Sequence, residues 1–410
     1  MNYLDILMDQ NENYKLLEYE FSQKLYYFGD HFKHPNEVNK KTRAFKNFIL
    51  NSIHLPIPKF HEKVIQSNTY IGFPGLNQRK DTKVIKPLWQ NKLINNPSGS
   101  LKRIKTFLYN PDLSYIYREK FSEDYLSIID FFYNYYDKNI KSVIVPYDLP
   151  FFERLTLKIF NDLKRPNAVF LHGLPARYNN IDDNRAEKLF VWGEAIKRNY
   201  VNSGNDGASI VVVGHPRYSL LKSKSLKKMK NPKTALVLTK AVAGGKSNSC
   251  NFISRVDRNQ SLIYLDKIKK ALKNFAFNKV VLRPHPSESI DWYSSKIDLD
   301  FFTLDKLPLN QSIHNVDIVI GPSSTVLLDS VLAGKNYVVF EPCDQNGNDI
   351  LGYPIVDPFN DKNSGLIISN TTEELCDTIS SEMQIEHDCL FDYVSTSFKS
   401  KVVEDYLLCN

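Results

Sequence analysis

Short apolar runs rich in β-branched residues recur along most of this chain, and stretches with helical periodicity separate them. The runs lie at residues 142–148, 168–173, 189–193, 210–216, 234–239, 279–282, 317–320, 337–340 and 365–368. An apolar run bounded by polar residues is typical of a strand buried on both faces. Strands that alternate with helices favour parallel sheets joined by right-handed crossovers. The sequence therefore predicts an α/β fold.

The alternation is interrupted by a lysine-rich segment at residues 222–233. A chain of 410 residues is also longer than one core usually serves. We therefore expect two Rossmann-like domains, 1–221 and 222–390, that face a central cleft. A closing helix within 391–410 is expected to pack back on the first domain. An amphipathic helix is predicted over 14–28, and the polar interval 76–105 is predicted to be a loop.

Composition narrows the class of protein. Hydrophobic residues make up 42% of the chain and charged residues 24%, as in globular proteins. No apolar window is long enough to span a bilayer, and the N-terminus lacks a secretion-signal pattern. We expect a cytoplasmic protein. Its five cysteines include no C-x-x-C pair, which predicts reduced thiols and no structural zinc.

The formal net charge of +7 is concentrated in two places, residues 222–233 and 79–105. Lysine runs are most often solvated surface. The alternative is attraction to an anionic partner, such as the phospholipid at the inner face of the cytoplasmic membrane or a lipid-linked acceptor. Nucleic acid is not expected as a partner, because no aromatic residues interleave with the basic ones and no recognition motif is present.

Two strand ends in the second half carry the strongest functional signal. His285 follows the strand at 279–282 between two prolines, which fix its direction. Ser323, Ser324 and Thr325 follow the strand at 317–320 and precede a helical stretch closed by Gly334. Hydroxyls and free amides at a helix start bind anions, so the pair predicts a phosphate site. The alternatives are a buried structural histidine and an ordinary N-cap, although a cap explains one hydroxyl and not three.

Further candidates lie at neighbouring strand ends. Arg283 adds a positive charge beside His285, although alternation along the strand points it to the opposite face. Glu341 follows the strand at 337–340 and is a candidate acceptor for ribose hydroxyls, or an ordinary loop carboxylate. Lys240 opens a small-residue loop that resembles a phosphate-binding loop but lacks P-loop spacing.

The first half offers candidates for acid–base chemistry. His172 follows the strand at 168–171 and is suited to act as a general base, with a loop-capping histidine as the alternative. Asp148 and Glu153 flank the start of a helix, and a sugar transfer needs a carboxylate nucleophile or a base. Glu153 is equally explained as an acidic residue at a helix start. His215 is interpreted as structural, with Arg217 as a possible phosphate or backbone contact.

Taken together, these motifs resemble those of bacterial GT-B glycosyltransferases of surface-polysaccharide assembly. The resemblance is carried by His172-Gly173-Leu174-Pro175, Gly214-His215-Pro216-Arg217, Arg283-Pro284-His285-Pro286 and Ser323-Ser324-Thr325, and it covers residues 140–345. It is similar in kind to the sialyl- and Kdo transferases, which use CMP-linked donors, and to the CDP-glycerol glycerophosphotransferases. The chain departs from the first group by having His172-Gly173 in place of two acidic residues and Gly. It departs from the last by having Gly321-Pro322 before the paired serines in place of Asp and Tyr.

The resemblance implies a metal-independent transferase that needs no cofactor beyond its nucleotide-sugar donor. The donor, expected to be CMP-linked, would lie on the second domain against Lys240, Arg283, His285, Ser323, Ser324, Thr325 and Glu341. His172, Asp148 or Glu153 would act on a glycan or lipid-linked glycan acceptor from the first domain, and His285 would assist departure of the nucleotide. Three alternatives stay open: a CDP-glycerol-type glycerophosphotransferase, an enzyme like UDP-GlcNAc 2-epimerase, and a non-catalytic binding subunit.

Overall fold

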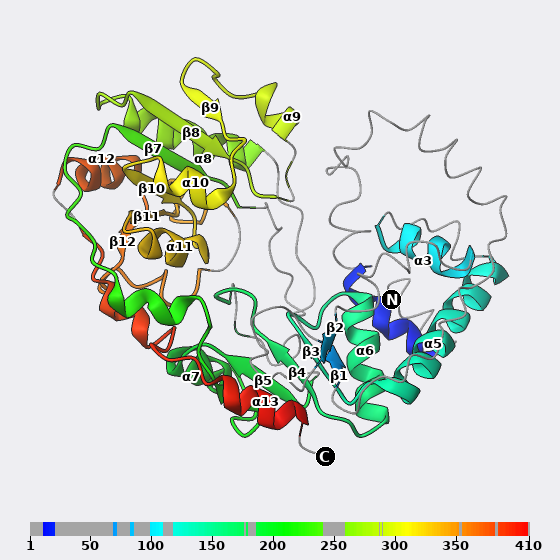
Figure 1. Ribbon diagram of the computed structural model, residues 1–410. Helices are drawn as coiled ribbons and strands as arrows, with labels where there is room; N and C mark the ends of the chain where they lie inside the picture. The colour runs from blue at the N-terminus through cyan, green and yellow to red at the C-terminus, as the bar shows by residue number, and fades with distance from the viewer. Residues whose placement is uncertain are drawn as a thin grey trace.

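Two parallel β-sheets of six strands each form the framework of the protein (Figure 1). The structure is a computed structural model and describes residues 11–20, 69–71, 83–85, 99–109, 118–175, 178, 186–240, 259–286, 288, 290–351, 355–381 and 384–408. Every strand pair in both sheets is parallel. The predicted α/β fold with two Rossmann-like domains is confirmed.

The first sheet has the strand order β2-β1-β3-β4-β5-β6. Its strands are β1 (Thr69–Ile71), β2 (Lys83–Ile85), β3 (Ser142–Val145), β4 (Asn167–Phe170), β5 (Lys188–Val191) and β6 (Ile210–Val212). The helices of this half are η1 (Glu12–Leu17), α3 (Gly99–Tyr109), α5 (Glu119–Asn139), α6 (Phe151–Asp162), α7 (Glu194–Asn202) and η6 (Tyr218–Ser223).

The second sheet has the strand order β12-β11-β10-β7-β8-β9. Its strands are β7 (Thr234–Leu238), β8 (Lys279–Arg283), β9 (Phe302–Leu304), β10 (Ile318–Gly321), β11 (Asn336–Phe340) and β12 (Ile367–Ser369). The helices that follow β6 are α8 (Asn259–Leu272), α9 (Ile290–Ser294), α10 (Leu309–His314), α11 (Val326–Leu332), α12 (Thr372–Ser380), η7 (His387–Phe391) and α13 (Ser400–Leu408).

The order of the second sheet determines where a ligand can bind. Read from β9, the strands follow the doubly wound order 3-2-1-4-5-6. Successive strands are added on one side of β7 as far as β9 and then on its other side from β10 onward, so the switch point of the sheet lies between β7 and β10. A crevice forms at the carboxyl ends of the strands at such a switch point. All residues of β10 and β11 are buried, as expected for strands covered by helices on both faces. The residues after β7, β8 and β10 therefore project toward one edge.

The sequence prediction was wrong for part of the polar interval 76–105, because residues from Gly99 onward form helix α3. Leu101, Ile104 and Leu108 recur on one face of this helix and are buried against α5. An ion pair from Arg103 to the buried Asp124 of α5 fixes the contact. The lysines between the apolar positions hid this periodicity. Of the helix predicted over 14–28, the short helix η1 is present, and residues 21–28 lie outside the described residues.

The segment after η7 returns from the second sheet to the first, and α13 (red) lies beside the first sheet in Figure 1. Its backbone amides at Ser395 and Lys399 donate to the carbonyls of Trp192 (2.8 Å) and Val213 (2.7 Å). Tyr406 of α13 donates to the carbonyl of Asn167 in β4 at 2.9 Å. The return segment is thus hydrogen-bonded to the ends of three strands of the first sheet.

Two glycines make this return path possible. A Cβ atom at Gly193 would collide with the backbone of Asp392 and Tyr393, and one at Gly214 would collide with the carbonyl of Ser397. Gly214 also has a φ of +78°, which disfavours other residues. The return segment therefore packs directly on bare backbone at the ends of β5 and β6.

We expect Gly193→Ala to lower the free energy of unfolding by about 1–3 kcal/mol, because the added methyl group forces the return segment off the first sheet. Urea denaturation measures the change. Gly207→Ala is the matched control, since its Cβ meets only a Val201 methyl at 3.3 Å. Equal stability of the two variants would contradict the packing described for residues 392–399.

Candidate functional site

Three side chains meet at the edge of the second sheet marked by the switch point. Lys240, His285 and Ser323 each lie two residues beyond the ends of β7, β8 and β10, which are neighbours in the sheet. The Lys240 Nζ donates a hydrogen bond to Ser323 Oγ at 3.0 Å. The Lys240 charge also acts on the imidazole of His285. The sequence predicted that these strand ends converge, and the structure brings them together.

Each of the three predicted hydroxyls accepts a hydrogen bond from the protein itself. Ser323 accepts from Lys240, Ser324 accepts from the amide of Val326 at 3.3 Å, and Thr325 accepts from the amide of Leu174 at 2.8 Å. A hydroxyl that accepts in this way retains its own hydrogen as a donor. Three O–H donors in sequence can therefore be offered to an anionic ligand.

The pKa of Lys240 is strongly perturbed at this edge. Desolvation lowers its pKa to about 8, against the opposing attraction of the Glu341 carboxylate. Its charge state therefore changes just above neutral pH. An incoming phosphate would stabilise the ammonium form. The side chain is thus a cationic contact whose charge responds to its surroundings.

The loop that carries His285 is fixed by Glu288, which the sequence reasoning missed. Glu288 Oε2 accepts the backbone amide of His285 at 2.9 Å and also the hydroxyl of Thr239. Its other oxygen accepts from Tyr293 at 2.9 Å. Glu288 lies three residues after His285, a spacing at which a Glu side chain can reach back to a backbone amide, and this spacing could have indicated its role. The side chain of His285 reaches solvent, but partial desolvation of its ring lowers its pKa, and the Lys240 charge lowers it further. The neutral form of the imidazole is therefore favoured near pH 7.

In the first half, His172 follows β4 and is oriented by a backbone carbonyl. Its Nδ1 lies 3.1 Å from the carbonyl oxygen of Pro146. Because a carbonyl can only accept, we assign the hydrogen to Nδ1, which leaves the lone pair on Nε2. Desolvation by the surrounding protein lowers the pKa of His172, although the bond to Pro146 opposes this. His172 is exposed and has the protonation state required of a base.

The two halves touch where Thr325 approaches the loop that carries His172 (the His172 loop). Thr325 Oγ1 accepts the amide of Leu174, two residues beyond His172. A Cβ atom at Gly173 would lie 2.9 Å from the same Thr325 oxygen, closer than such contacts normally are. The absence of a side chain at Gly173 therefore lets the His172 loop reach the start of α11.

The structure does not bring Arg283 into this cluster. Its guanidinium donates to Asp305 Oδ2 and to the carbonyl of Leu307, both at 2.7 Å. Asp305 also accepts from Ser312 at 2.6 Å. Arg283 therefore ties β8 to the segment after β9. This agrees with the alternation along the strand, which points its side chain away from His285.

The predicted carboxylates are buried. Asp148 is 1% exposed, Glu153 is 4% exposed and Glu341 is 1% exposed. Glu341 Oε1 accepts the backbone amide of Ser323 at 2.5 Å. Glu341 therefore contacts the cluster from the protein interior. Asp148 and Glu153 lie in the interior of the first half. Their roles as catalytic residues stay predictions.

His215 packs between aromatic rings at the junction of the two halves. Its ring centroid lies 4.6 Å from that of Trp192 and 4.5 Å from that of Tyr218. Its Nδ1 accepts the amide of Arg217 at 3.2 Å. Desolvation, and then the Arg217 charge, lowers its pKa to about 4. Arg217 itself forms an ion pair of 2.8 Å with Asp329 of α11, so this corner joins the two domains.

We expect acid to destabilise the protein partly through His215. The unfolded chain binds the proton with a pKa of 6.5 and the folded chain with a pKa of about 4, so stability is lost as pH falls through this window. The contribution is about 1–3 kcal/mol. His215→Gln should lose less stability than the wild type between pH 7 and pH 4.5 in urea denaturation. An identical loss in both proteins would contradict a neutral, partly buried His215.

The lysine-rich segment 222–233 is anchored at every third position. Leu226, Met229 and Pro232 are buried, while the lysines between them are exposed. The amides of Asn336 and Gln384 bind the carbonyls of Lys227 and Leu226 at 2.8 and 3.0 Å. The segment therefore runs along the second domain with its charges outward. Contact with an anionic surface stays a prediction. Most of the other basic stretch, 79–105, lies outside the described residues.

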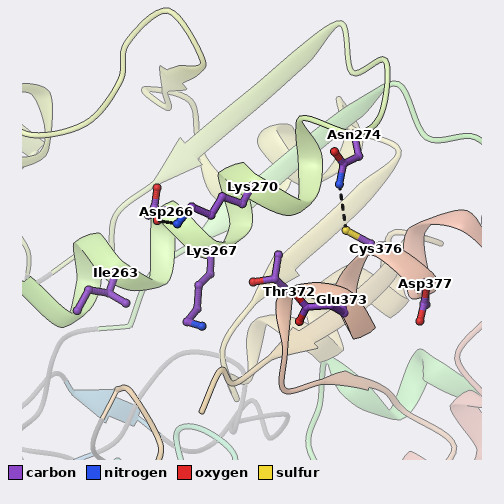
Figure 2. A pocket seen from close by; sticks show the side chains of 9 residues that line it. All are labelled: Ile263, Asp266, Lys267, Lys270, Asn274, Thr372, Glu373, Cys376 and Asp377. Carbon is purple, nitrogen blue, oxygen red and sulfur yellow. Dashed lines mark hydrogen bonds and ion pairs between the residues drawn. The ribbon is translucent and has the colours of Figure 1, made fainter. Parts of the chain in front are cut away.

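In the part of the chain that the structure describes, no group of three or more His, Cys, Asp or Glu side chains is arranged to hold a metal ion. None of the described helices is both long and apolar enough to cross a membrane. A surface cavity of about 660 Å³ lies between α8 and α12 and is lined by residues of mixed charge, such as Lys267, Glu373 and Asp377 (Figure 2). It includes none of the predicted site residues.

Comparison with known proteins places this architecture in the GT-B class of folds. Known protein families provide no model that matches the sequence, and no curated protein is detectably similar to it. Among solved structures, the S. aureus MnaA–UDP structure matches with a TM-score of 0.50 at 11% identity, over 83% of this chain and 96% of that chain.

Two further structures show a weaker likeness. The Neisseria meningitidis UDP-GlcNAc 2-epimerase bound to UDP-GlcNAc has a TM-score of 0.48 at 13% identity, over 84% of this chain and 99% of that one. The Anabaena HepE structure with UDP and glucose has a TM-score of 0.39 at 10% identity, over 83% and 95%. The likeness at this level of identity is one of fold.

Proposed function

We propose that this protein is an enzyme that processes a nucleotide sugar. The nucleotide phosphate would bind at Lys240, His285 and the hydroxyls of residues 323–325, with the sugar between them and His172. One observation carries the proposal: cationic and hydroxyl donors meet at the switch point of the second sheet, and Thr325 joins them to the His172 loop of the first. A phosphate needs such donors, and a sugar reaction needs a base beside them.

The identity of the proposed nucleotide differs from the one expected from the sequence. The sequence motifs suggested a CMP-linked donor. The fold likeness to S. aureus MnaA, whose structure holds UDP, supports a uridine nucleotide as the first candidate instead. Lys240 and the hydroxyls would contact phosphate and not the base, so they are compatible with either nucleotide. UDP-linked sugar is therefore our leading substrate class.

Epimerisation of a UDP-linked sugar, one of the alternatives that the sequence leaves open, is the leading reaction, because UDP is the nucleotide held by the S. aureus MnaA structure. In such a reaction a base removes the proton from the carbon next to the anomeric centre, the C–H electron pair forms a double bond, and the nucleotide leaves with its phosphate. Return of the nucleotide to the anomeric carbon and of a proton to the opposite face of the neighbouring carbon then gives the epimer. His172 Nε2, which carries the lone pair, would act as one such base. Lys240 and the hydroxyls would stabilise the negative charge on the nucleotide phosphate.

Glycosyl transfer is the second candidate, and a specific observation favours it. Asp148 and Glu153 are buried, so His172 is the predicted catalytic residue of the first half that reaches solvent. A transfer needs one base: the acceptor hydroxyl gives its proton to His172 Nε2, its oxygen bonds to the anomeric carbon, and the nucleotide leaves with the electron pair.

Thermal-shift measurements with UDP, CMP, CDP and GDP test the nucleotide. We expect UDP to stabilise the protein, by about 2.7 kcal/mol at a concentration one hundred times its Kd. Lys240→Met should abolish the shift, since it removes the ammonium that faces the phosphate. Lys267→Met on the outer helix α8 is the control. A shift with CMP or CDP alone would restore the cytidine assignment, and no shift with any nucleotide would refute the proposal.

Turnover without an added acceptor separates the two reactions, because an epimerase interconverts the sugar while a transferase at most hydrolyses its donor slowly. In whichever assay is active, we expect His172→Asn to reduce turnover by about 10²- to 10⁴-fold while leaving the nucleotide thermal shift unchanged. The Asn amide can still donate to Pro146. His314→Asn on α10 is the control. Full activity of His172→Asn would mean that another group is the base.

A further inference from the structure

The peptide unit that joins Pro322 to Ser323 is held on both sides by β11. Tyr337 of this strand donates its hydroxyl to the carbonyl of Pro322 at 2.6 Å. Glu341, four residues later, accepts the amide of Ser323 at 2.5 Å. One side chain thus binds the C=O and the other binds the N–H of the same peptide. The plane of this peptide, and with it the direction of the Ser323 side chain, is fixed from the neighbouring strand.

The residues before Ser323 match this arrangement. A Cβ atom at Gly321 would collide with the Tyr337 hydroxyl, so only glycine allows the tyrosine to reach the Pro322 carbonyl. Pro322 restricts the backbone at the same turn and adds no amide that would need a partner. The Gly-Pro pair, which departs from the Asp and Tyr of the glycerophosphotransferases, is therefore complementary to Tyr337 and Glu341.

The Glu341 carboxylate also attracts the Lys240 ammonium. Both side chains bind Ser323, Glu341 at its amide and Lys240 at its hydroxyl. Tyr337 and Tyr264 are buried beside the same carboxylate, and His285 and Glu288 approach from the β8 side. In these low-dielectric surroundings, a carboxylate stabilises a neighbouring ammonium strongly.

We propose that Tyr337 and Glu341 are positioning residues for the nucleotide phosphate: together they fix the Ser323 peptide, and the Glu341 carboxylate attracts the Lys240 ammonium that binds the Ser323 hydroxyl. This inference rests on the proposed function of the site. It replaces the expectation that Glu341 binds a ribose. A carboxylate that is 1% exposed and occupied by the Ser323 amide is oriented toward the protein interior.

The affinity for the nucleotide phosphate is expected to depend on pH. Phosphate binds the ammonium form of Lys240, so affinity falls as pH rises through the pKa of about 8. Glu341 raises that pKa, and neutralising it would move the fall to lower pH. Tyr337 contributes a hydrogen bond and no charge, so its removal should weaken binding without moving the fall.

Calorimetric titration of UDP from pH 7 to 9.5 tests the two roles, with each variant compared with the wild type at the same pH so that titration of UDP cancels. For Glu341→Gln, whose amide oxygen can still accept from Ser323, we expect affinity to begin falling at lower pH, with roughly tenfold weaker binding at pH 8. For Tyr337→Phe we expect an equal loss at every pH. An equal loss at every pH for Glu341→Gln would overturn its effect on Lys240.

A ribose role gives a different result. If Glu341 bound the ribose, Glu341→Gln would weaken UDP binding but leave 2′- or 3′-deoxy-UDP unaffected. The positioning role predicts the same proportional loss for all three ligands. Loss confined to UDP would therefore overturn the inference.

A measurement without ligand separates failure of this inference from failure of the proposed function. Lysines carrying ¹³C-methyl groups report their own protonation by NMR, and Lys240→Arg identifies the signal of Lys240. We expect Glu341→Gln to lower the titration midpoint of Lys240 and Tyr337→Phe to leave it in place. If the wild type bound no nucleotide, the proposed function would fail, and an unchanged midpoint would refute the effect of Glu341 on Lys240 independently.

Discussion

The constraint on which the rest of the structure depends is that parallel strands joined by right-handed crossovers all end at the same edge of their sheet. In the second domain this places the residues after β7, β8 and β10 side by side, although up to 83 positions separate Lys240 from Ser323 in the chain. Neither residue is near the other in sequence. The sheet supplies the proximity, and the site chemistry follows from which residues occupy the three ends.

Much of this could be predicted from the sequence, because strand burial and strand ends leave local signals. The apolar runs gave the strands of both sheets from β3 onward, apart from β9, and the polar residues that terminate them gave Lys240, His285 and residues 323–325. Helix α3 was missed because lysines interrupt its apolar face. Residues that hold the site residues in position were not predictable from the sequence. The contact of Glu341 with Ser323 requires β11 to lie next to β10, and the contact of Glu288 with His285 requires the turn after β8. Pairing of strands is set by the whole sheet, so no local pattern contains it.

Helix α11 and the residue before it contact the first domain at two places. Thr325 at its start contacts the amide of Leu174, and Asp329 one turn later binds Arg217 and the Tyr218 hydroxyl. The first contact lies at the candidate site and the second at the aromatic corner around His215. A helix shorter than two full turns thus connects the His172 loop of the first domain with the junction where the chain crosses to the second.

The return segment gives the molecule a second covalent crossing between its domains. The outward crossing runs through residues 224–233 and the return crossing through residues 384–399, and Gln384 of the latter donates to the carbonyl of Leu226 in the former. A single linker would let one domain rotate about any axis. Two linkers joined by a hydrogen bond restrict rotation of one domain relative to the other more than a single linker would. We therefore expect relative motion of the domains to consist mainly of opening and closing, which returns the His172 loop to the Ser323 edge in the same register.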